Sequence, residues 1–168
     1  AMGLPQRVDS LTRALVVLGR EKFYRWLSLL IFDFTDPTYQ ERALAEQSLA
    51  RGRTLELLAG QGQVPNTPDA LFLIGLFSLL DVAMGQPLPD LLAQANLPDV
   101  VRDTLMNRAG PHADALALVV LGEANATEAS VEALTHALTQ CGLDDHQFLA
   151  AYRQAIDWAH QLLGEVAA

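Results

Sequence analysis

Apolar residues recur every three to four positions along most of the chain, which is the spacing of amphipathic helices. Strict alternation of apolar and polar residues, the pattern of a half-buried strand, does not occur. Short connectors containing Gly or Pro separate the helical segments. The pattern therefore predicts an all-α fold, a compact multi-helix bundle of about nine helices, and a single domain over residues 1–168.

Capping residues and prolines place the helices along the chain. Asp36-Pro37 and Thr67-Pro68 each put a capping side chain before a proline at the first helical position. Asp144 and Gln147 have the spacing of a capping box. We expect Gly52, inside a long helix, to mark a bend or a close contact with another helix. The predicted helices span residues 8–18, 20–34, 36–59, 67–85, 87–95, 98–108, 112–121, 127–140 and 144–163.

The most apolar stretch, residues 70–80, is followed by a single carboxylate, Asp81. It is shorter than the ~20 apolar residues that cross a bilayer, so we expect no membrane span. A helix that is apolar nearly all round is buried, and a buried carboxylate needs a partner. Ser78 precedes Asp81 by three residues on the same helix face. We therefore expect Asp81 to be structural, either bonded to the Ser78 hydroxyl or in contact with solvent at the helix end.

Charge and cysteine content narrow the class of function. The chain is 51% hydrophobic with a net charge of -9, whereas nucleic-acid binding requires a basic surface, so we expect no nucleic-acid partner. Cys141 is the only cysteine, which excludes an internal disulfide and zinc sites that use two cysteines. A reducing compartment fits this content, and we expect a cytoplasmic protein.

The charge is distributed unevenly. Residues 1–53 contain eight basic and six acidic residues, a net +2, whereas residues 54–168 contain three basic and fourteen acidic residues, a net -11. Solvated helix surfaces explain such a pattern most simply. The functional alternative is a face for a protein partner on the N-terminal helices, formed by Arg13, Arg20, Lys22 and Arg25.

Motifs that carry catalysis are absent from the sequence. It contains no P-loop, no Gly-x-Gly-x-x-Gly, no Gly-x-Ser-x-Gly and no His-Glu-x-x-His. The four histidines do not have metal-ligand spacing, and the sequence places no base beside Cys141. The motif search therefore yields no catalytic residue.

Three stretches resemble the HDOD domains, helical signalling modules of bacteria that are related to the HD phosphohydrolases. They are residues 8–19 (VDSLTRALVVLG), 23–30 (FYRWLSLL) and 75–80 (GLFSLL). Residues 84–92 and Leu97-Pro98 resemble the branch in which an HDOD domain follows an EAL domain. The resemblance extends over residues 7–125 and is carried by apolar and glycine positions.

The resemblance also locates a degenerate metal site. True HD phosphohydrolases have a metal-binding His-Asp pair in the segment that corresponds to residues 75–80; here Ser78 stands at the His and Leu79 at the Asp. Gln47 stands in the place of the first ligand His. Amide, hydroxyl and alkyl groups cannot replace imidazole and carboxylate ligands, and without the metal no water is activated. Asp81 lies two residues beyond Leu79, about 200° around a helix, and points elsewhere. The resemblance therefore implies no metal, no other cofactor and no hydrolysis.

These expectations lead to one main hypothesis and two alternatives. The resemblance implies a non-catalytic regulatory and protein-interaction module of a bacterial signal-transduction protein. Its expected partner is an EAL domain upstream in the same chain, which links it to cyclic di-GMP signalling. One alternative is a divergent metal-dependent HD-type phosphohydrolase that uses other Asp, Glu and His ligands. The other is a helical sensor that encloses a small apolar ligand in its Leu- and Phe-rich core.

Overall fold

The structure, a computed structural model, describes residues 19, 38–95, 97–124 and 127–166. Within these ranges it contains eight helices and no strand, which confirms the predicted all-α bundle. The helices predicted over residues 8–18 and 20–34 lie outside the described residues, as do Arg13, Arg20, Lys22 and Arg25. The helices are α3 (Tyr39–Leu58), α4 (Pro68–Phe77), α5 (Leu80–Met84), α6 (Leu88–Gln94), α7 (Asp99–Asn107), α8 (Pro111–Gly122), α9 (Glu128–Cys141) and α10 (Asp145–Val166).

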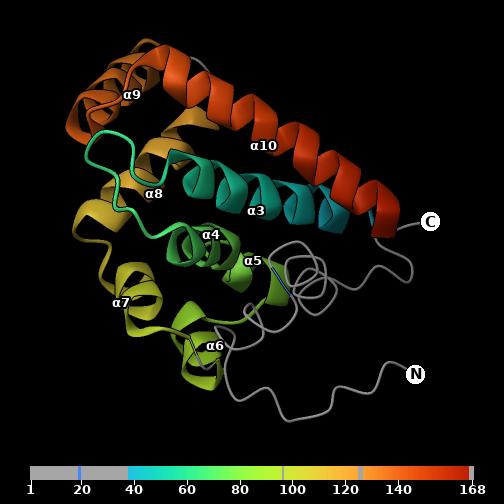
Figure 1. Cartoon of the computed structure of the whole chain (residues 1–168). Coiled ribbons are helices and arrows are strands. Elements are labelled where there is room, and N and C mark those ends of the chain that lie inside the picture. The colour runs from blue at the N-terminus through green and yellow to red at the C-terminus, as the bar shows by residue number, and fades with distance from the viewer. Residues whose placement is uncertain (1–18, 20–37, 96, 125–126, 167–168) are drawn as a thin grey trace.

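Helix α3 runs through the middle of the bundle, with α10 along one side and α4 along the other (Figure 1). Helices α8 and α9 pack on each other, α7 packs on α4, and α8 also reaches α3. A continuous cluster of buried apolar side chains joins these helices, including Leu49 and Leu55 of α3, Phe72 of α4 and Leu116 of α8. The central position of α3 brings its side chains within reach of most of the bundle.

The cap of α10 is as predicted, whereas those of α3 and α4 are not, since the side chain of Thr67 makes no capping hydrogen bond at the start of α4. Thr127 caps α9, and Asp144 accepts a hydrogen bond from the Gln147 backbone in a capping box at the start of α10. Helix α3 is capped by Thr38, not by Asp36. The Thr38 hydroxyl accepts from the Glu41 backbone N–H, and the Glu41 carboxylate accepts from the Thr38 N–H at 2.7 Å. This reciprocal pair satisfies two helix-end donors and fixes the start of α3 at Tyr39.

Helices α3 and α4 approach so closely that their contact requires glycine. A Cβ atom on Gly52 would lie 2.8 Å from the carbonyl oxygen of Phe72, and one on Gly75 would lie 2.5 Å from the Cα atom of Gly52. Both positions are therefore closed to any side chain. The predicted close contact at Gly52 is confirmed.

The single helix predicted over residues 67–85 is wrong, because the helix is interrupted after Phe77 and the backbone leaves helical geometry at Leu79. Leu79 has φ -116° and ψ 13°, and it separates α4 from α5. The Ser78 hydroxyl donates to the carbonyl of Gly75 at 2.6 Å, satisfying an acceptor at the end of α4. A hydroxyl has one proton, so Ser78 does not donate to Asp81, and the first of the two alternatives for Asp81 is wrong. Asp81 is half-buried in α5.

The connection between α3 and α4 is attached to the end of α9. The Gln63 backbone N–H donates to the carbonyl of Cys141 at 2.7 Å. Gly142 then ends α9 in the left-handed conformation, with φ 63°. One end of the α8–α9 pair is thereby joined to the loop that follows α3.

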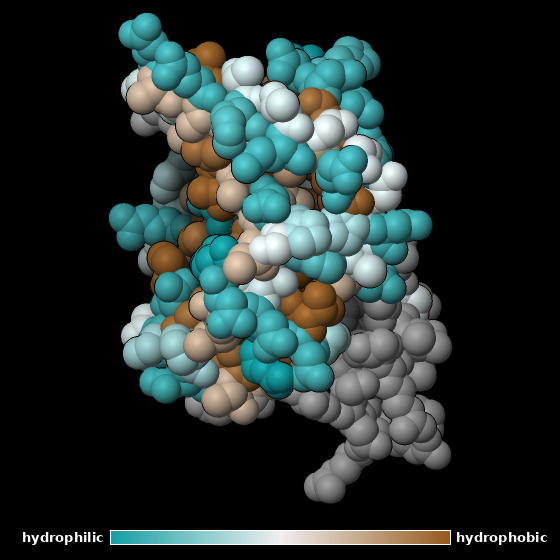
Figure 2. Space-filling model, turned by 90° about the vertical axis from the view of Figure 1, so that its left-hand side faces the viewer, coloured by the Kyte–Doolittle hydropathy of each residue, from teal (hydrophilic) through white to brown (hydrophobic). Residues whose placement is uncertain are grey.

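The surface mixes polar and apolar residues. On the face shown in Figure 2, hydrophilic side chains surround small apolar patches. Of the helices that the structure describes, none has an apolar stretch long enough to cross a bilayer. Residues 71–77 of α4, the most apolar stretch, are buried in the core as predicted.

Candidate functional site: a buried arginine cluster

A buried arginine connects α3, α4 and α8. The side chain of Arg51 is 6% exposed and that of Glu123, at the end of α8, is 9% exposed. Arg51 donates from Nε to Oε1 of Glu123 at 2.9 Å and from Nη2 to Oε2 at 2.5 Å. Two parallel hydrogen bonds between guanidinium and carboxylate form the strongest common type of ion pair in proteins. Arg51 also donates from Nη1 to the Ser78 hydroxyl at 2.7 Å.

Two of the three predicted degenerate metal positions belong to this cluster. Gln47 lies one turn before Arg51 on the same face of α3, and its Nε2 donates to Oε2 of Glu123 at 2.8 Å. Ser78 accepts from Arg51, as described above. The structure therefore brings Gln47 and Ser78 to one place. Leu79, half-buried at the start of α5, has an alkyl side chain and makes no hydrogen bond there.

Two helix ends explain why a cation is stable at this position. Ser78 is the C-terminal cap of α4, and Glu123 is the C-terminal cap of α8. The C-terminal end of a helix carries a partial negative charge, which stabilises a nearby cation. The close contact at Gly52 holds Arg51, its neighbour in the chain, beside the end of α4. The guanidinium thus meets two helix ends, one carboxylate and one hydroxyl.

The sequence interpretation missed Arg51 and Glu123. By sequence, Arg51 is one of the eight basic residues of the segment 1–53, and Glu123 is one of the fourteen acids of the segment 54–168. One local signal was available, since Arg51 follows Gln47 by four residues in a stretch that contains Leu49 and Leu55. No local signal connects Arg51 with Glu123, because they are far apart in the sequence.

An open groove of about 460 Å³ lies between α3 and α10, next to the cluster. Gln47 and Glu123 belong to both the cluster and the groove. Glu46 lines the same wall, and its Oε1 lies 2.7 Å from Nε2 of His160 on α10. Tyr152 of α10 is half-buried there; burial raises its pKa, Glu123 raises it further, and Arg51 opposes the shift. The buried cluster is therefore reached from solvent through a polar groove.

Other reactive side chains lie apart from the groove. In the ranges that the structure covers, no group of three His, Cys, Asp or Glu side chains is arranged to hold a metal ion. Burial raises the pKa of the Cys141 thiol, and Asp114 adds to the shift, which disfavours the thiolate that a nucleophile needs. Burial lowers the pKa of His112, whose Nε2 lies 2.9 Å from the Thr67 hydroxyl at the start of α4.

Comparison with known proteins gives two similar bacterial chains. No protein-family model matches the chain, and no solved structure matches it significantly. It is 28% identical over 162 residues to the uncharacterized protein YuxH of Bacillus subtilis, covering 95% of this chain and 38% of YuxH. It is 31% identical over 104 residues to the cyclic di-GMP phosphodiesterase CdgJ of Vibrio cholerae, covering 62% of this chain and 24% of CdgJ. The chain thus spans less than two fifths of the length of either relative, and membership of the HDOD family stays a prediction.

Proposed function

We propose that this chain is a non-catalytic regulatory and protein-interaction module of a bacterial signalling protein. We further propose that it is cytoplasmic and acts in cyclic di-GMP signalling through an EAL domain in the same protein. The observation that supports this most strongly is the position of Arg51. Its guanidinium lies between Ser78 and Glu123, and Glu123 also accepts from Gln47, so a fixed organic cation is held where the resemblance places a metal.

A guanidinium supplies positive charge but not the chemistry of a metal ion. A catalytic divalent ion binds water in an open coordination position and lowers the pKa of that water. Arginine has only N–H donors and stays protonated, so it can neither coordinate water nor act as a base. A divalent ion placed beside Arg51 would also be repelled by it. The cluster is therefore suited to holding helices together and not to hydrolysis.

The similar proteins support the cyclic di-GMP connection. CdgJ is named as a cyclic di-GMP phosphodiesterase, and this chain matches about a quarter of it. YuxH is also much longer than this chain, which matches 38% of its length. We infer that the matched part is a helical module that accompanies a catalytic part. Such a module regulates by binding differently to two states of its partner.

A metal and activity assay tests the absence of catalysis. The purified chain would be analysed for bound Mn, Fe and Zn, then assayed for hydrolysis of cyclic di-GMP with and without EDTA, with CdgJ as the active control. We expect no turnover that EDTA abolishes. Stoichiometric metal together with EDTA-sensitive hydrolysis would replace this proposal with the HD-type phosphohydrolase.

A binding assay tests the partner and the proposed basic face. The chain would be titrated against the EAL domain of its own full-length protein. We expect Arg20→Glu combined with Arg25→Glu to weaken binding by about tenfold, because reversing charges at an interface creates repulsion. Arg153→Glu, an exposed arginine of α10, is the matched control. Unchanged binding by the double variant would show that the basic face is wrong.

A further inference from the structure

We infer that the groove between α3 and α10 binds a basic side chain, arginine or lysine, of a protein partner. The inference rests on the proposed function in that it treats the chain as an interaction module. It adds the chemistry of the segment that the module recognises.

The groove presents two carboxylates to an incoming group, Glu46 and Glu123. Arg51 donates to both carboxylate oxygens of Glu123, and the exposed Gln47 amide also donates to Oε2 at 2.8 Å beside the groove. A neutral amide is a weaker partner for a carboxylate than a cation is, because a cation adds the attraction of opposite charges to the hydrogen bond. An entering guanidinium or ammonium can therefore take the place of the Gln47 amide and also reach Glu46.

Aromatic and apolar residues also line the groove, and they suit the charged group and the methylene stem of a long basic side chain. Tyr39, 88% exposed, and the half-buried Tyr152 provide aromatic rings. A cation over such a ring is attracted to its face. Ala50 and Ile156 line the groove with small apolar surface, which suits the methylene stem of lysine or arginine.

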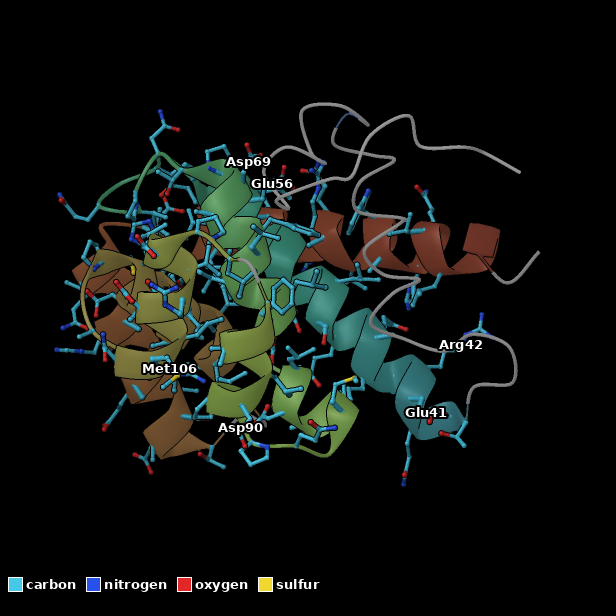
Figure 3. All side chains as sticks on the ribbon, turned by 90° about the horizontal axis from the view of Figure 1, so that it is seen from below. Glu41, Arg42, Glu56, Asp69, Asp90 and Met106 are labelled. Atoms are coloured by element: carbon cyan, nitrogen blue, oxygen red, sulfur yellow. The ribbon has the colours of Figure 1, made fainter. Side chains whose placement is uncertain are left out.

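Positive and negative groups surround the groove in similar numbers. Arg42 also lines it and lies at the N-terminal end of α3 (Figure 3), Arg51 lies behind Glu123, and His160 contacts Glu46. These groups leave the groove itself close to neutral. The net charge of the whole chain, -9, then favours the approach of a basic segment.

Phosphate-bearing ligands fit the groove less well. Arg51, the cation of the cluster, has a side chain that is only 6% exposed and lies behind Glu123. A phosphate entering the groove would therefore meet the carboxylates of Glu46 and Glu123 before that guanidinium, and like charges repel. The exposed Arg42 could hold one phosphate at the outer end, without reaching the cluster.

The test is a titration of the whole chain, labelled with nitrogen-15, with the acetylated peptide Ala-Ala-Arg-Ala-Ala. The matched probe replaces its arginine with citrulline, which has nearly the same shape without the charge. We expect saturable shifts of the Gln47 side-chain amide and of amides in α3 and α10. The citrulline peptide should bind about tenfold more weakly, because it loses the attraction between its positive charge and the two carboxylates.

Two variants localise the binding. Glu46→Gln should weaken binding of the arginine peptide by about fivefold, since one of the two carboxylates is lost. Glu132→Gln, an exposed position on α9, should leave it unchanged. Amide spectra report whether each variant is folded.

Three results would overturn the inference: equal binding of the citrulline peptide, no effect of Glu46→Gln, or stronger shifts of the same amides by GMP. None of these bears on hydrolysis. A chain that ignores the arginine peptide and also fails to hydrolyse cyclic di-GMP would lose this inference and keep the proposed function.

Discussion

Arg51 and Gly52 are neighbours in α3, and they contact α4 in different ways. Gly52 has no side chain, and the backbone of α4 fills the space at its Cα. Arg51 extends a charged side chain past the same helix to the Ser78 hydroxyl and to Glu123 of α8. The first contact depends on shape and the second on charge, within one residue of each other.

The difference shows two ways of fixing the same pair of helices. A close backbone contact excludes any added side-chain atom, but it does not depend on a charged or polar partner. A buried ion pair does depend on its partner, since a buried carboxylate without a cation is destabilising. Substitutions at the glycine contact and at the ion pair should therefore differ in how much they lower the free energy of unfolding. They should also differ in whether a second substitution can restore it.

The largest effect is expected from Arg51→Met. It leaves Glu123 buried without its cation, so the free energy of unfolding should fall by about 3–5 kcal/mol. Urea unfolding followed by circular dichroism measures the loss. Arg51→Lys keeps the charge without the two-pronged geometry, and its loss should be intermediate.

The double variant Arg51→Met with Glu123→Leu sharpens this prediction. Replacing both members of a buried ion pair with apolar residues is often close to neutral. The double variant should therefore be more stable than the sum of the single losses by about 2 kcal/mol or more. Additive losses would show that the two side chains are not coupled.

Gly75→Ala is expected to have the next largest effect. The added Cβ would lie 2.5 Å from the Cα atom of Gly52, and backbone on both sides cannot move aside cheaply. We expect a loss of about 2–3 kcal/mol in unfolding free energy. The control is Gly164→Ala in α10, where a Cβ meets no atom within 4 Å. That change should stabilise by about 0.5–1 kcal/mol, since alanine favours helix.

Ser78→Ala tests a single connection of the cluster. It removes the acceptor of the Arg51 Nη1 hydrogen bond and the donor to the Gly75 carbonyl, while the ion pair with Glu123 remains. We expect a loss of about 1–2 kcal/mol by urea unfolding. A loss as large as that of Arg51→Met would mean that Ser78, and not Glu123, is the main partner of the guanidinium.

The smallest effect concerns the other end of α4, where Thr67 meets the half-buried His112. Burial lowers the pKa of His112 below its unfolded value of about 6.5, so the unfolded chain takes up the proton first. Above the unfolded pKa, the contribution of His112 to the free energy of unfolding is constant. The free energy of unfolding falls as the pH drops from the unfolded pKa towards the lower pKa of the folded chain. His112→Gln should reduce the loss between about pH 7.5 and about pH 5.5, measured by urea unfolding. His136→Gln, at an exposed position, should not.

Local features of the fold could be predicted from the sequence, and distant ones could not. The positions of α6, α7, α8 and α9 follow from prolines, caps and the glycine after α9, all of which act within one turn. The break at Leu79 was missed because residues 70–80 are uniformly apolar and give no local stop signal. It depends on Ser78 bonding to Gly75 and to Arg51 of another helix.

The candidate site shows the same limit. Family resemblance indicated Gln47 and Ser78 as former ligand positions, and the structure places both at the cluster. It could not indicate the Arg51–Glu123 pair, because that pair joins α3 to the end of α8. A pairing between distant residues leaves no trace in periodicity or in capping signals.

The α8–α9 pair is fastened twice, by Glu123 to Arg51 at its turn and by Cys141 to Gln63 at its far end. A helix pair that is bonded to the rest of the bundle at both ends cannot rotate about one end as a rigid body. A large displacement of α8 and α9 therefore requires that one of the two connections break first. Hydrogen exchange at the Gln63 amide and the Arg51 guanidinium would report which is released first.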